Sequence, residues 1–231
     1  MIEVSVYSHD GNQLDEKVLL DERIFLYPVN YDLLYLDTRA IMANRRSGTH
    51  KTKERSEVHG STRKLRPQKH LGRARVGSIT NPIFRHGGTV FGPRPRKYYQ
   101  KVNKKAKLLA RISALSYIYK NSHMRIIKDI QLTEIKTRNI AQIINNLGFS
   151  CKESRVLLVT LPDEKIRLST RNLPAVSCTT PHTLNTYDML SARAIIFTKS
   201  SILTLQEELL TRAQKYGIDL SKSSDTTQKT T

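Results

Sequence analysis

Three things are scarce in this 231-residue chain: cysteine, long apolar runs and, over its middle third, acidic residues. With only two cysteines, Cys151 and Cys178, a disulfide framework is not expected, and both thiols should be free in a reducing compartment. No run of consecutive apolar residues exceeds four, which is too short to span a membrane. The first ten residues lack a basic region and an apolar core, which argues against a secretory signal or a transit peptide.

The missing acids leave the charge of the chain unevenly distributed. No Asp or Glu occurs between Glu57 and Asp129. Residues 45–107 contain nineteen Lys and Arg against two Glu, a net charge of +17, whereas the whole chain carries +19. Because such a segment repels itself, an external polyanion is the expected partner. A membrane is not expected as a partner, since the segment lacks a long amphipathic apolar face.

Residues 45–102 do not have the pattern of a folded domain. They hold seven of the ten glycines and four of the eight prolines, and they sustain no helical or strand period. A loop of about 58 residues is unusual in a compact domain unless a partner orders it. Run out and back at ~3.3 Å per residue, it would reach at most roughly 90 Å. We therefore predict one very long, extended, RNA-penetrating basic loop over 45–102, inserted after the first helix.

The remaining residues, 1–44 and 103–220, predict one discontinuous globular domain. Alternating apolar residues indicate a strand over 2–7 with a return partner at 18–20, and a helix is expected over 30–45. Asn103 is the expected N-cap of a further helix. Lys104, Lys107 and Arg111 share one face of that helix, so it continues the basic surface.

Short strands alternate with helices in the second half of the chain. Strands are expected at 125–130, 155–161, 176–179 and 194–198. Helices are expected with a cap at 137, after 163 and from 200 or 201, with a turn near 185–188. This alternation is typical of βαβ units, so the predicted fold class is α/β, with a mostly parallel sheet covered by helices. Residues 221–231 are polar and of low complexity, which predicts a disordered tail.

No catalytic or metal-binding pattern stands out. Residues 72–78 (GRARVGS) have the glycine spacing of a phosphate loop, but they lack the Lys after the second glycine and follow no expected strand. Residues 86–88 (HGG) are not accompanied by a G-x-S-x-G elbow, and the acids show no paired-carboxylate pattern. The histidines of the basic segment have no ligand spacing and are expected to be solvated or to contact phosphates: His50, His59, His70 and His86. We expect no enzymatic activity, no cofactor and no metal.

RNA fits the basic segment better than duplex DNA. No recognition helix is expected there, and an extended peptide follows irregular folded RNA more readily than a uniform groove. Phe84 and Phe91 are candidates for stacking on unpaired bases. Tyr98 and Tyr99 either stack as well or pack on the globular domain at the base of the loop. The candidate RNA-binding cations are Arg45, Arg46, Lys51, Lys53, Arg55, Arg63, Lys64, Arg66, Lys69, Arg73, Arg75, Arg85, Arg94, Arg96, Lys97, Lys101, Lys104 and Lys105.

A longer sequence pattern makes the functional interpretation more specific. Within the basic segment it comprises residues 48–58 (GTHKTKERSEV), 68–69 (QK), 72–79 (GRARVGSI), 82–85 (PIFR) and 87–95 (GGTVFGPRP). Further along it comprises 104–105 (KK), 114–116 (ALS), 171–173 (RNL) and 185–188 (NTYD). On these residues the chain closely resembles the bacterial-type large-subunit ribosomal protein L-four family, to about residue 215.

The resemblance implies a structural constituent of the large ribosomal subunit that binds large-subunit ribosomal RNA and supports early assembly. It also implies a loop tip that lines the nascent-peptide exit tunnel opposite protein L-twenty-two and affects the macrolide response. Some members repress their own operon, so the chain's own messenger leader is a further candidate partner. Carried over by position, the tunnel tip comprises Arg66, Pro67, Gln68, Lys69, His70, Leu71 and Gly72.

The tip departs from the family pattern. His70 and Leu71 stand where the family usually has Gly-Thr, and residues 65–67 (LRP) stand where Pro-Trp-Arg is common. His70 and Leu71 are bulkier than those residues and enter positive φ less readily than glycine does. The shape of the tunnel constriction is therefore expected to differ from the family norm.

Two other function classes stay open on the sequence alone. One is a non-ribosomal RNA-binding regulator, whereas a leader hairpin upstream of the gene that mimics the ribosomal site would favour repression of the chain's own messenger. The other is an RNA-modifying enzyme with a basic insert, which would need a cofactor pocket, although the sequence has no glycine fingerprint for one. The expected location is a ribosome in the bacterial cytoplasm, with an organelle-encoded copy as the alternative.

Overall fold

The computed structural model describes residues 1–149 and 155–220, so Cys151 and the tail expected over 221–231 lie outside the described residues. The chain divides into two compact units. The first unit combines Met1–Met42 with the chain from Lys101 onward, and the second unit is Ala43–Gln100.

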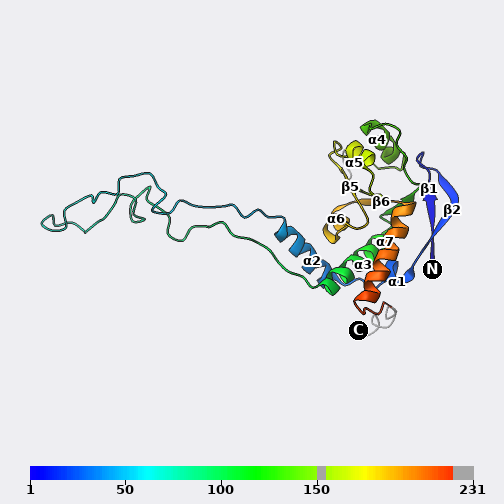
Figure 1. Cartoon of the computed structure of the whole chain (residues 1–231), viewed down its shortest axis with the longest axis horizontal. Coiled ribbons are helices and arrows are strands. Elements are labelled where there is room, and N and C mark those ends of the chain that lie inside the picture. The colour runs from blue at the N-terminus through cyan, green and yellow to red at the C-terminus, as the bar shows by residue number, and fades with distance from the viewer. Residues whose placement is uncertain (150–154, 221–231) are drawn as a thin grey trace. The chain divides into compact units, whose positions relative to one another are not determined.

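A six-stranded sheet forms the centre of the first unit (Figure 1). Its strands are β1 (Ile2–Tyr7), β2 (Gln13–Leu20), β3 (Met124–Ile127), β4 (Val156–Val159), β5 (Val176–Thr179) and β6 (Ala194–Thr198), in the spatial order β2-β1-β3-β6-β4-β5. Among the described residues β1 and β2 pair antiparallel, and the other four pairings are parallel. The predicted α/β class, with a mostly parallel sheet, is confirmed.

Helices cover both faces of this sheet. They are α1 (Glu22–Phe25), α2 (Tyr31–Asn44), α3 (Lys104–Lys120), α4 (Thr137–Asn146), α5 (Glu164–Thr170), α6 (Thr186–Ser191) and α7 (Lys199–Lys215). Side chains that alternate along β4 separate two apolar clusters, with Leu157 and Val159 in the larger and Val156 and Leu158 in the smaller. The larger cluster packs α3 and α7 on one face, and the smaller packs α4 and α5 on the other.

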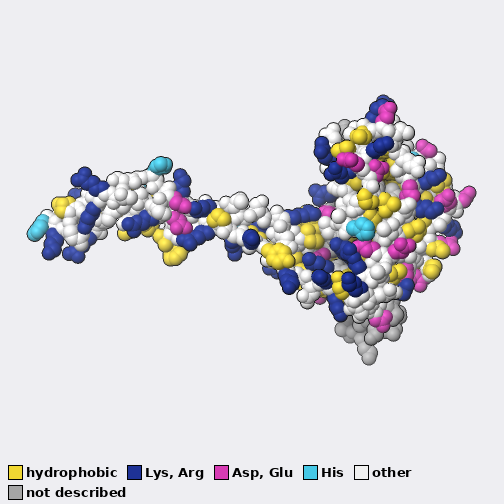
Figure 2. All heavy atoms as spheres, in the orientation of Figure 1, with side chains coloured by type: hydrophobic (Ala, Val, Ile, Leu, Met, Phe, Trp, Pro, Cys, Tyr) yellow, Lys and Arg dark blue, Asp and Glu magenta, His cyan; other side chains and the backbone are white. Residues whose placement is uncertain are grey.

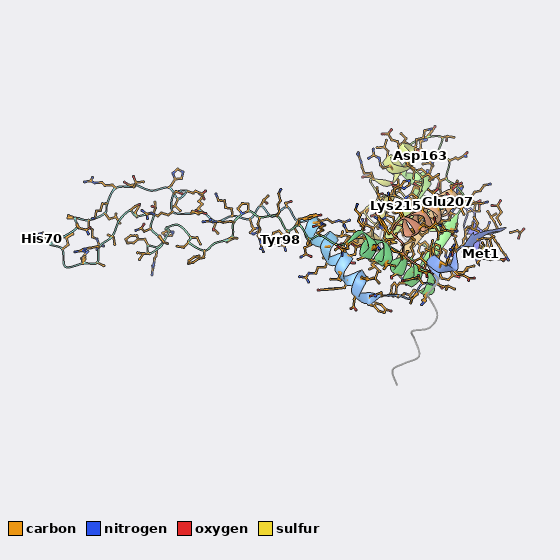
Figure 3. All side chains as sticks on the ribbon, turned by 60° about the horizontal axis from the view of Figure 1, so that its bottom comes forward. Met1, His70, Tyr98, Asp163, Glu207 and Lys215 are labelled. Atoms are coloured by element: carbon orange, nitrogen blue, oxygen red, sulfur yellow. The ribbon has the colours of Figure 1, made fainter. Side chains whose placement is uncertain are left out.

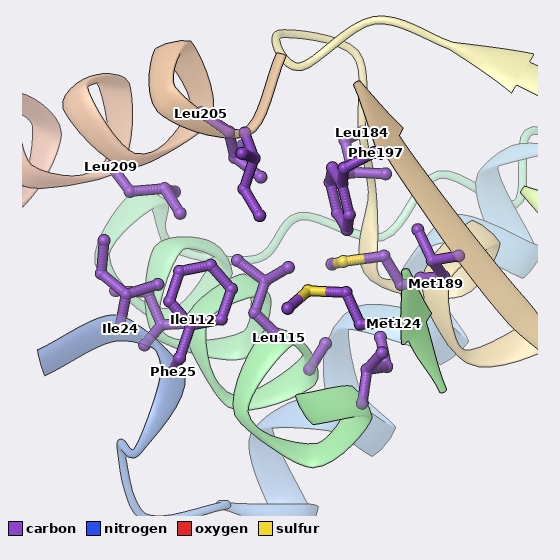
Figure 4. Close-up of a cluster of buried hydrophobic side chains, with 14 of the residues drawn as sticks. Ile24, Phe25, Ile112, Leu115, Met124, Leu184, Met189, Phe197, Leu205 and Leu209 are labelled. Carbon is purple, nitrogen blue, oxygen red and sulfur yellow. The ribbon is translucent and has the colours of Figure 1, made fainter. Parts of the chain in front are cut away.

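The larger cluster is the main core of the first unit. Figure 4 shows Ile112 and Leu115 of α3 facing Leu205 of α7 and Phe197 of β6 in this cluster, and all four side chains are nearly inaccessible to solvent. Neither apolar cluster contains a residue from 43–100. The core of the first unit therefore closes without the basic segment. Among the described residues, no helix combines the length and the apolar character needed to cross a membrane.

Two short helices were not expected from the sequence. The segment predicted as a turn near 185–188 is the start of α6, where Asn185 caps the helix by accepting a hydrogen bond from the Asp188 amide at 2.8 Å. The prediction was wrong because a capping Asn and a turn Asn have the same local signal. The four-residue α1 follows a similar cap at Asp21, and it is too short to show a helical period.

Several boundaries also shift. β3 ends at Ile127 instead of residue 130, β4 covers 156–159 instead of 155–161, and α7 begins at Lys199. Thr137 is the first residue of α4 and not its cap, which is Lys136. Asn103 does occupy the N-cap of α3, but its side chain makes no capping hydrogen bond. Such differences arise because burial and strand pairing, which set the ends of elements, involve distant residues.

Candidate nucleic-acid interface

The second unit contains no helix or strand in its described residues beyond the last residues of α2. Its chain nevertheless folds back on itself through nested backbone hydrogen bonds. The Arg96 amide donates to the Gly48 carbonyl at 3.1 Å, the Thr89 amide to Lys53 at 3.0 Å, and the Leu65 amide to Gly77 at 3.1 Å. Two arms therefore run side by side along the segment (Figure 1). Most backbone groups of such a sparse ladder stay available to a partner.

Glycines let the two arms approach closely. Gly48 has a φ of +65°, and a Cβ atom built there would lie 2.0 Å from the carbonyl oxygen of Arg96. A Cβ atom at Gly88 would lie 2.3 Å from the backbone nitrogen of Arg55. Because backbone atoms cannot swing aside as a long side chain can, neither position accepts a larger residue without moving the arms apart.

Glu54 and Glu57, the two acids of the basic segment, form contacts within the unit. Glu57 pairs with Lys51 and accepts a hydrogen bond from the Glu54 amide at 3.2 Å. The hydrogen bond from Lys51 is the main reason why the pKa of Glu57 is lowered. Glu54 pairs with Arg94 on the opposite arm, with 2.8 Å between Oε1 and Nε. Both acids thus hold the segment together and leave most of its positive charge uncompensated.

Tyr98 organises the cations at one end of the unit. The guanidinium carbons of Arg46 and Arg96 lie 4.1 and 4.5 Å from the centre of its ring, and its hydroxyl lies 3.3 Å from His50 Nε2. Tyr98 therefore packs within the basic segment, on residues of both arms, and the ring presents two arginines together. Tyr99, by contrast, is 71% exposed.

A small polar core stabilises the middle of the unit. Ser78 and Thr80 are both buried, and their hydroxyl oxygens are 2.7 Å apart. Ser78 also donates to the Ser61 carbonyl at 3.0 Å, and the Gly88 amide donates to the Thr80 carbonyl at 3.0 Å. Sequence reasoning missed these residues, because isolated Ser and Thr in a polar stretch give no signal of burial.

The predicted cations of the interface lie mainly at the surface. Of the eighteen, Arg66 is partly buried and the other seventeen are exposed, and Figure 2 shows Lys and Arg side chains along the whole second unit. Fifteen of the eighteen belong to that unit, whereas Lys101, Lys104 and Lys105 belong to the first unit. Among the stacking candidates, Phe91 is 99% exposed and Phe84 is partly buried. An almost fully exposed Phe in a cationic setting is the arrangement that base stacking requires.

The predicted tip is the point where the chain reverses, with His70 at the end of the second unit (Figure 3). His70 has a φ of +70° and Gly72 a φ of +59°. The backbone thus adopts the left-handed conformation at His70, and this costs roughly 1–2 kcal/mol for a residue with a side chain. Leu71, at 49% exposure, is not packed into any apolar cluster.

The first unit also contains a cavity beside a largely buried thiol. A cavity of about 480 Å³ lies at the carboxyl ends of β4 and β5, lined in part by Asp163, Arg167 and Cys178. Burial raises the pKa of the Cys178 thiol, so the protonated, poorly nucleophilic form is favoured. In the part of the chain that the structure describes, no three His, Cys, Asp or Glu side chains gather in a way that could hold a metal ion.

Comparison with known proteins points to one family. A model described as the ribosomal protein L4/L1 family matches residues 18–208. The chain is 43% identical over 209 residues to large ribosomal subunit protein uL4 of Chlorobium phaeobacteroides, which covers 90% of this chain and 100% of that protein. It is 44% identical over 208 residues to the protein of the same name from Parabacteroides distasonis, covering 89% and 98%. A third such protein, from Amoebophilus asiaticus, is 40% identical over 206 residues, covering 89% and 98%.

Proposed function

The chain belongs to the ribosomal protein L4/L1 family, and on this premise we propose that it is a non-catalytic structural constituent of the large ribosomal subunit that anchors itself in ribosomal RNA through residues 45–102. One observation supports this most directly. The second unit carries exposed cations along two sparsely paired arms, and its two acids are already used in internal ion pairs. Such a surface gains free energy of binding to RNA by neutralising phosphates and releasing their counterions.

The binding mode follows from the same residues. Cations along both arms would contact phosphates, while Phe91 would stack on an unpaired base. The internal contacts of Glu54, Glu57 and Tyr98 lower the entropy lost on ordering, because part of the bound arrangement exists beforehand. Folding of RNA around the segment would make the protein an early assembly component.

A more detailed part of the proposal concerns the loop tip, and it rests on the positions that these residues occupy in the family pattern. Residues 66–72 would line the nascent-peptide exit tunnel beside protein L-twenty-two. The three relatives named above are bacterial, which supports a place on the ribosome in a bacterial cytoplasm. A messenger leader that imitates the ribosomal site would bind the same cations, so repression of its own operon belongs to this proposal as a secondary role.

Binding to transcribed fragments of large-subunit RNA tests the proposal. The affinity of the full chain is measured for each fragment and for unrelated RNA of equal length, over a salt series. With roughly 6–10 phosphates contacted, affinity should fall on the order of 10³–10⁵-fold between about 50 and 200 mM salt. One fragment should retain an advantage over the unrelated RNA at the higher salt. Equal loss for all RNAs would leave only generic charge attraction and would contradict a specific ribosomal site.

A further inference from the structure

A second cationic site lies in the first unit, between α3 and α7. It is a cleft of about 120 Å³ lined by Lys104, Lys107, Leu108, Arg111, Arg212 and Tyr216. Four cationic side chains from two helices thus meet around one small space. The sequence brings Lys104, Lys107 and Arg111 to one helix face, but it gives no indication that Arg212, about a hundred residues further on, joins them.

The electrostatics of this cleft favour an anion. Arg111 is partly buried, and burial, with the charge of Arg212 as a smaller contribution, lowers its pKa. Arg nevertheless keeps its charge in proteins, so the cost of that buried charge stays in the folded state.

The nearest acids already have partners, and one of these partners is Arg212 of the cleft itself, so Glu208 neutralises part of the positive charge there. Glu208 pairs with Arg212 and lies 2.5 Å from His182 Nδ1, and Asp37 accepts a hydrogen bond from the Thr186 hydroxyl at 2.5 Å. The charges of Glu208 and Asp37 offset part of the cost of burying the Arg111 guanidinium, yet neither acid forms an ion pair with Arg111 among the described residues.

The start of α3 adds positive potential to the same cleft. Its first turn contains no acid, and the Asn103 side chain makes no capping hydrogen bond. Lys104, Lys105 and Lys107 therefore stand at the positive end of a 17-residue helix, where cations are unfavourable and anions are stabilised. An anion in the cleft would offset the unfavourable positive charge at the start of α3 and would also reduce the repulsion between Arg111 and Arg212.

The size of the cleft indicates what kind of anion it takes. A volume of about 120 Å³ holds several waters or one phosphate group. It is well below the ~300–1,000 Å³ typical of pockets that enclose small-molecule ligands. A phosphate that belongs to a larger polyanion lying across the surface fits this space.

We propose that the cleft between α3 and α7 seats one backbone phosphate of RNA, held by Lys107, Arg111 and Arg212 and bordered by Tyr216. The inference rests on the proposed function and deepens it. It gives the globular unit a phosphate site of its own, in addition to the basic segment, and it assigns a binding role to the C-terminal helix α7.

The test compares two charge reversals in the full chain. Lys107→Glu places an acid inside the cleft and in the first turns of α3, where it favours the helix. Arg138→Glu makes the same change of charge in the first turn of α4, which also lacks an acid and a side-chain cap, but away from the cleft. Lys107 and Arg138 are both exposed, so both variants should fold. Arg111→Gln is a third variant that removes the partly buried charge.

The readout is the salt dependence of binding to the RNA fragment that the wild-type chain binds most tightly. Each phosphate contact contributes ~0.7–0.9 to the steepness with which the logarithm of the affinity falls with the logarithm of the salt concentration. At 0.1 M salt, this corresponds to about five- to eightfold in affinity. Lys107→Glu and Arg111→Gln should each lose about that much relative to Arg138→Glu. Lys107→Glu should also show no fall in melting temperature.

Failure of the cleft and failure of the proposed function give different results. If wild type prefers ribosomal RNA but Lys107→Glu behaves as Arg138→Glu does, the cleft proposal is overturned and the proposed function stands. If wild type shows no preference for ribosomal RNA, the proposed function fails. A reduced slope for Lys107→Glu would then still establish a phosphate seat.

Discussion

Tyr98 illustrates how one aromatic ring can position the cations around it. The ring lies beside the guanidinium groups of Arg46 and Arg96, and its hydroxyl approaches His50. Each cation–π contact at such an exposed site contributes about 0.5–1 kcal/mol. The aromatic ring therefore limits the freedom of two arginines that would otherwise be ordered only when RNA binds.

Replacing Tyr98 should weaken RNA binding through this loss of order. Tyr98→Leu removes both ring contacts, so affinity for large-subunit RNA should fall roughly five- to thirtyfold, from about 1–2 kcal/mol. Tyr98→Phe keeps the ring and should retain most of the affinity. The affinities of the two variants and the wild-type chain for this RNA, measured at one salt concentration, test this prediction. Equal losses for both variants would point to the hydroxyl and contradict the cation–π account.

A buried carboxylate makes a second position sensitive. Asp37 of α2 is 4% exposed and Thr186 of α6 is fully buried, and the hydroxyl of Thr186 donates to Asp37. Thr186→Val keeps the shape but leaves a buried acceptor without this donor, which should lower the free energy of unfolding by about 1–3 kcal/mol. Thr211→Val removes an exposed hydroxyl on α7 and should change it by less than about 0.5 kcal/mol. Urea denaturation measures both, and similar values would refute the prediction.

At the scale of elements, sequence reasoning succeeded where one pattern is repeated over several residues. The strand β1 follows an apolar alternation and the helix α3 an apolar period, whereas α2 lies where apolar residues are dense. The helix α5 follows Asp163 as expected. It failed for α1 and α6, which are too short to show a period. The spatial strand order, with β6 between β3 and β4, has no local signal because it depends on contacts between distant segments.

The candidate interface divides in the same way. Its cations were predictable, since exposed charge is visible in composition alone. The Tyr98 contacts, the buried Ser78–Thr80 pair and the cleft of Arg111 with Arg212 were not, because each joins residues that only the folded chain brings together. Sequence therefore indicates which residues carry charge, and structure shows how that charge is positioned.

The paired arms of the second unit depend on glycine. Gly88→Ala would put a Cβ atom 2.3 Å from the Arg55 backbone nitrogen, and such overpacking costs about 1–3 kcal/mol. We expect roughly tenfold weaker RNA binding and faster proteolysis within 43–100. A Cβ atom added at Gly77 would lie 3.5 Å from its nearest neighbour, Asn81 Nδ2, so Gly77→Ala is the matched control. Indistinguishable proteolysis of the two variants would show that the arms do not depend on close approach.

At the scale of the whole molecule, the apolar core and most of the positive charge lie in different parts of the chain. Both apolar clusters exclude residues 43–100, whereas most of the net charge lies there. Replacing residues 60–85 by a short Gly-Ser linker should therefore leave the thermal unfolding of the first unit nearly unchanged. The shortened protein should enter large subunits poorly in cells.

Two measurements check this prediction. Circular dichroism gives the melting temperature, and sedimentation of ribosomal particles gives incorporation and subunit yield. A lower melting temperature would mean that the segment supports the core. Normal incorporation with wild-type subunit yield would mean that the segment is dispensable for assembly.

The strand order also has a consequence for the time course of synthesis. β4 and β3 both pair with β6, so the sheet stays open until residue 198 has been made. From residue 100 to that point is about 100 residues, or ~5–20 s of translation at typical rates. Throughout that interval the chain already carries most of its +17 segment but has no closed core. A nascent chain thus attracts nucleic acid before its domain can fold. Binding to competing RNA during synthesis should therefore limit the yield of folded protein more than the stability of the mature domain does.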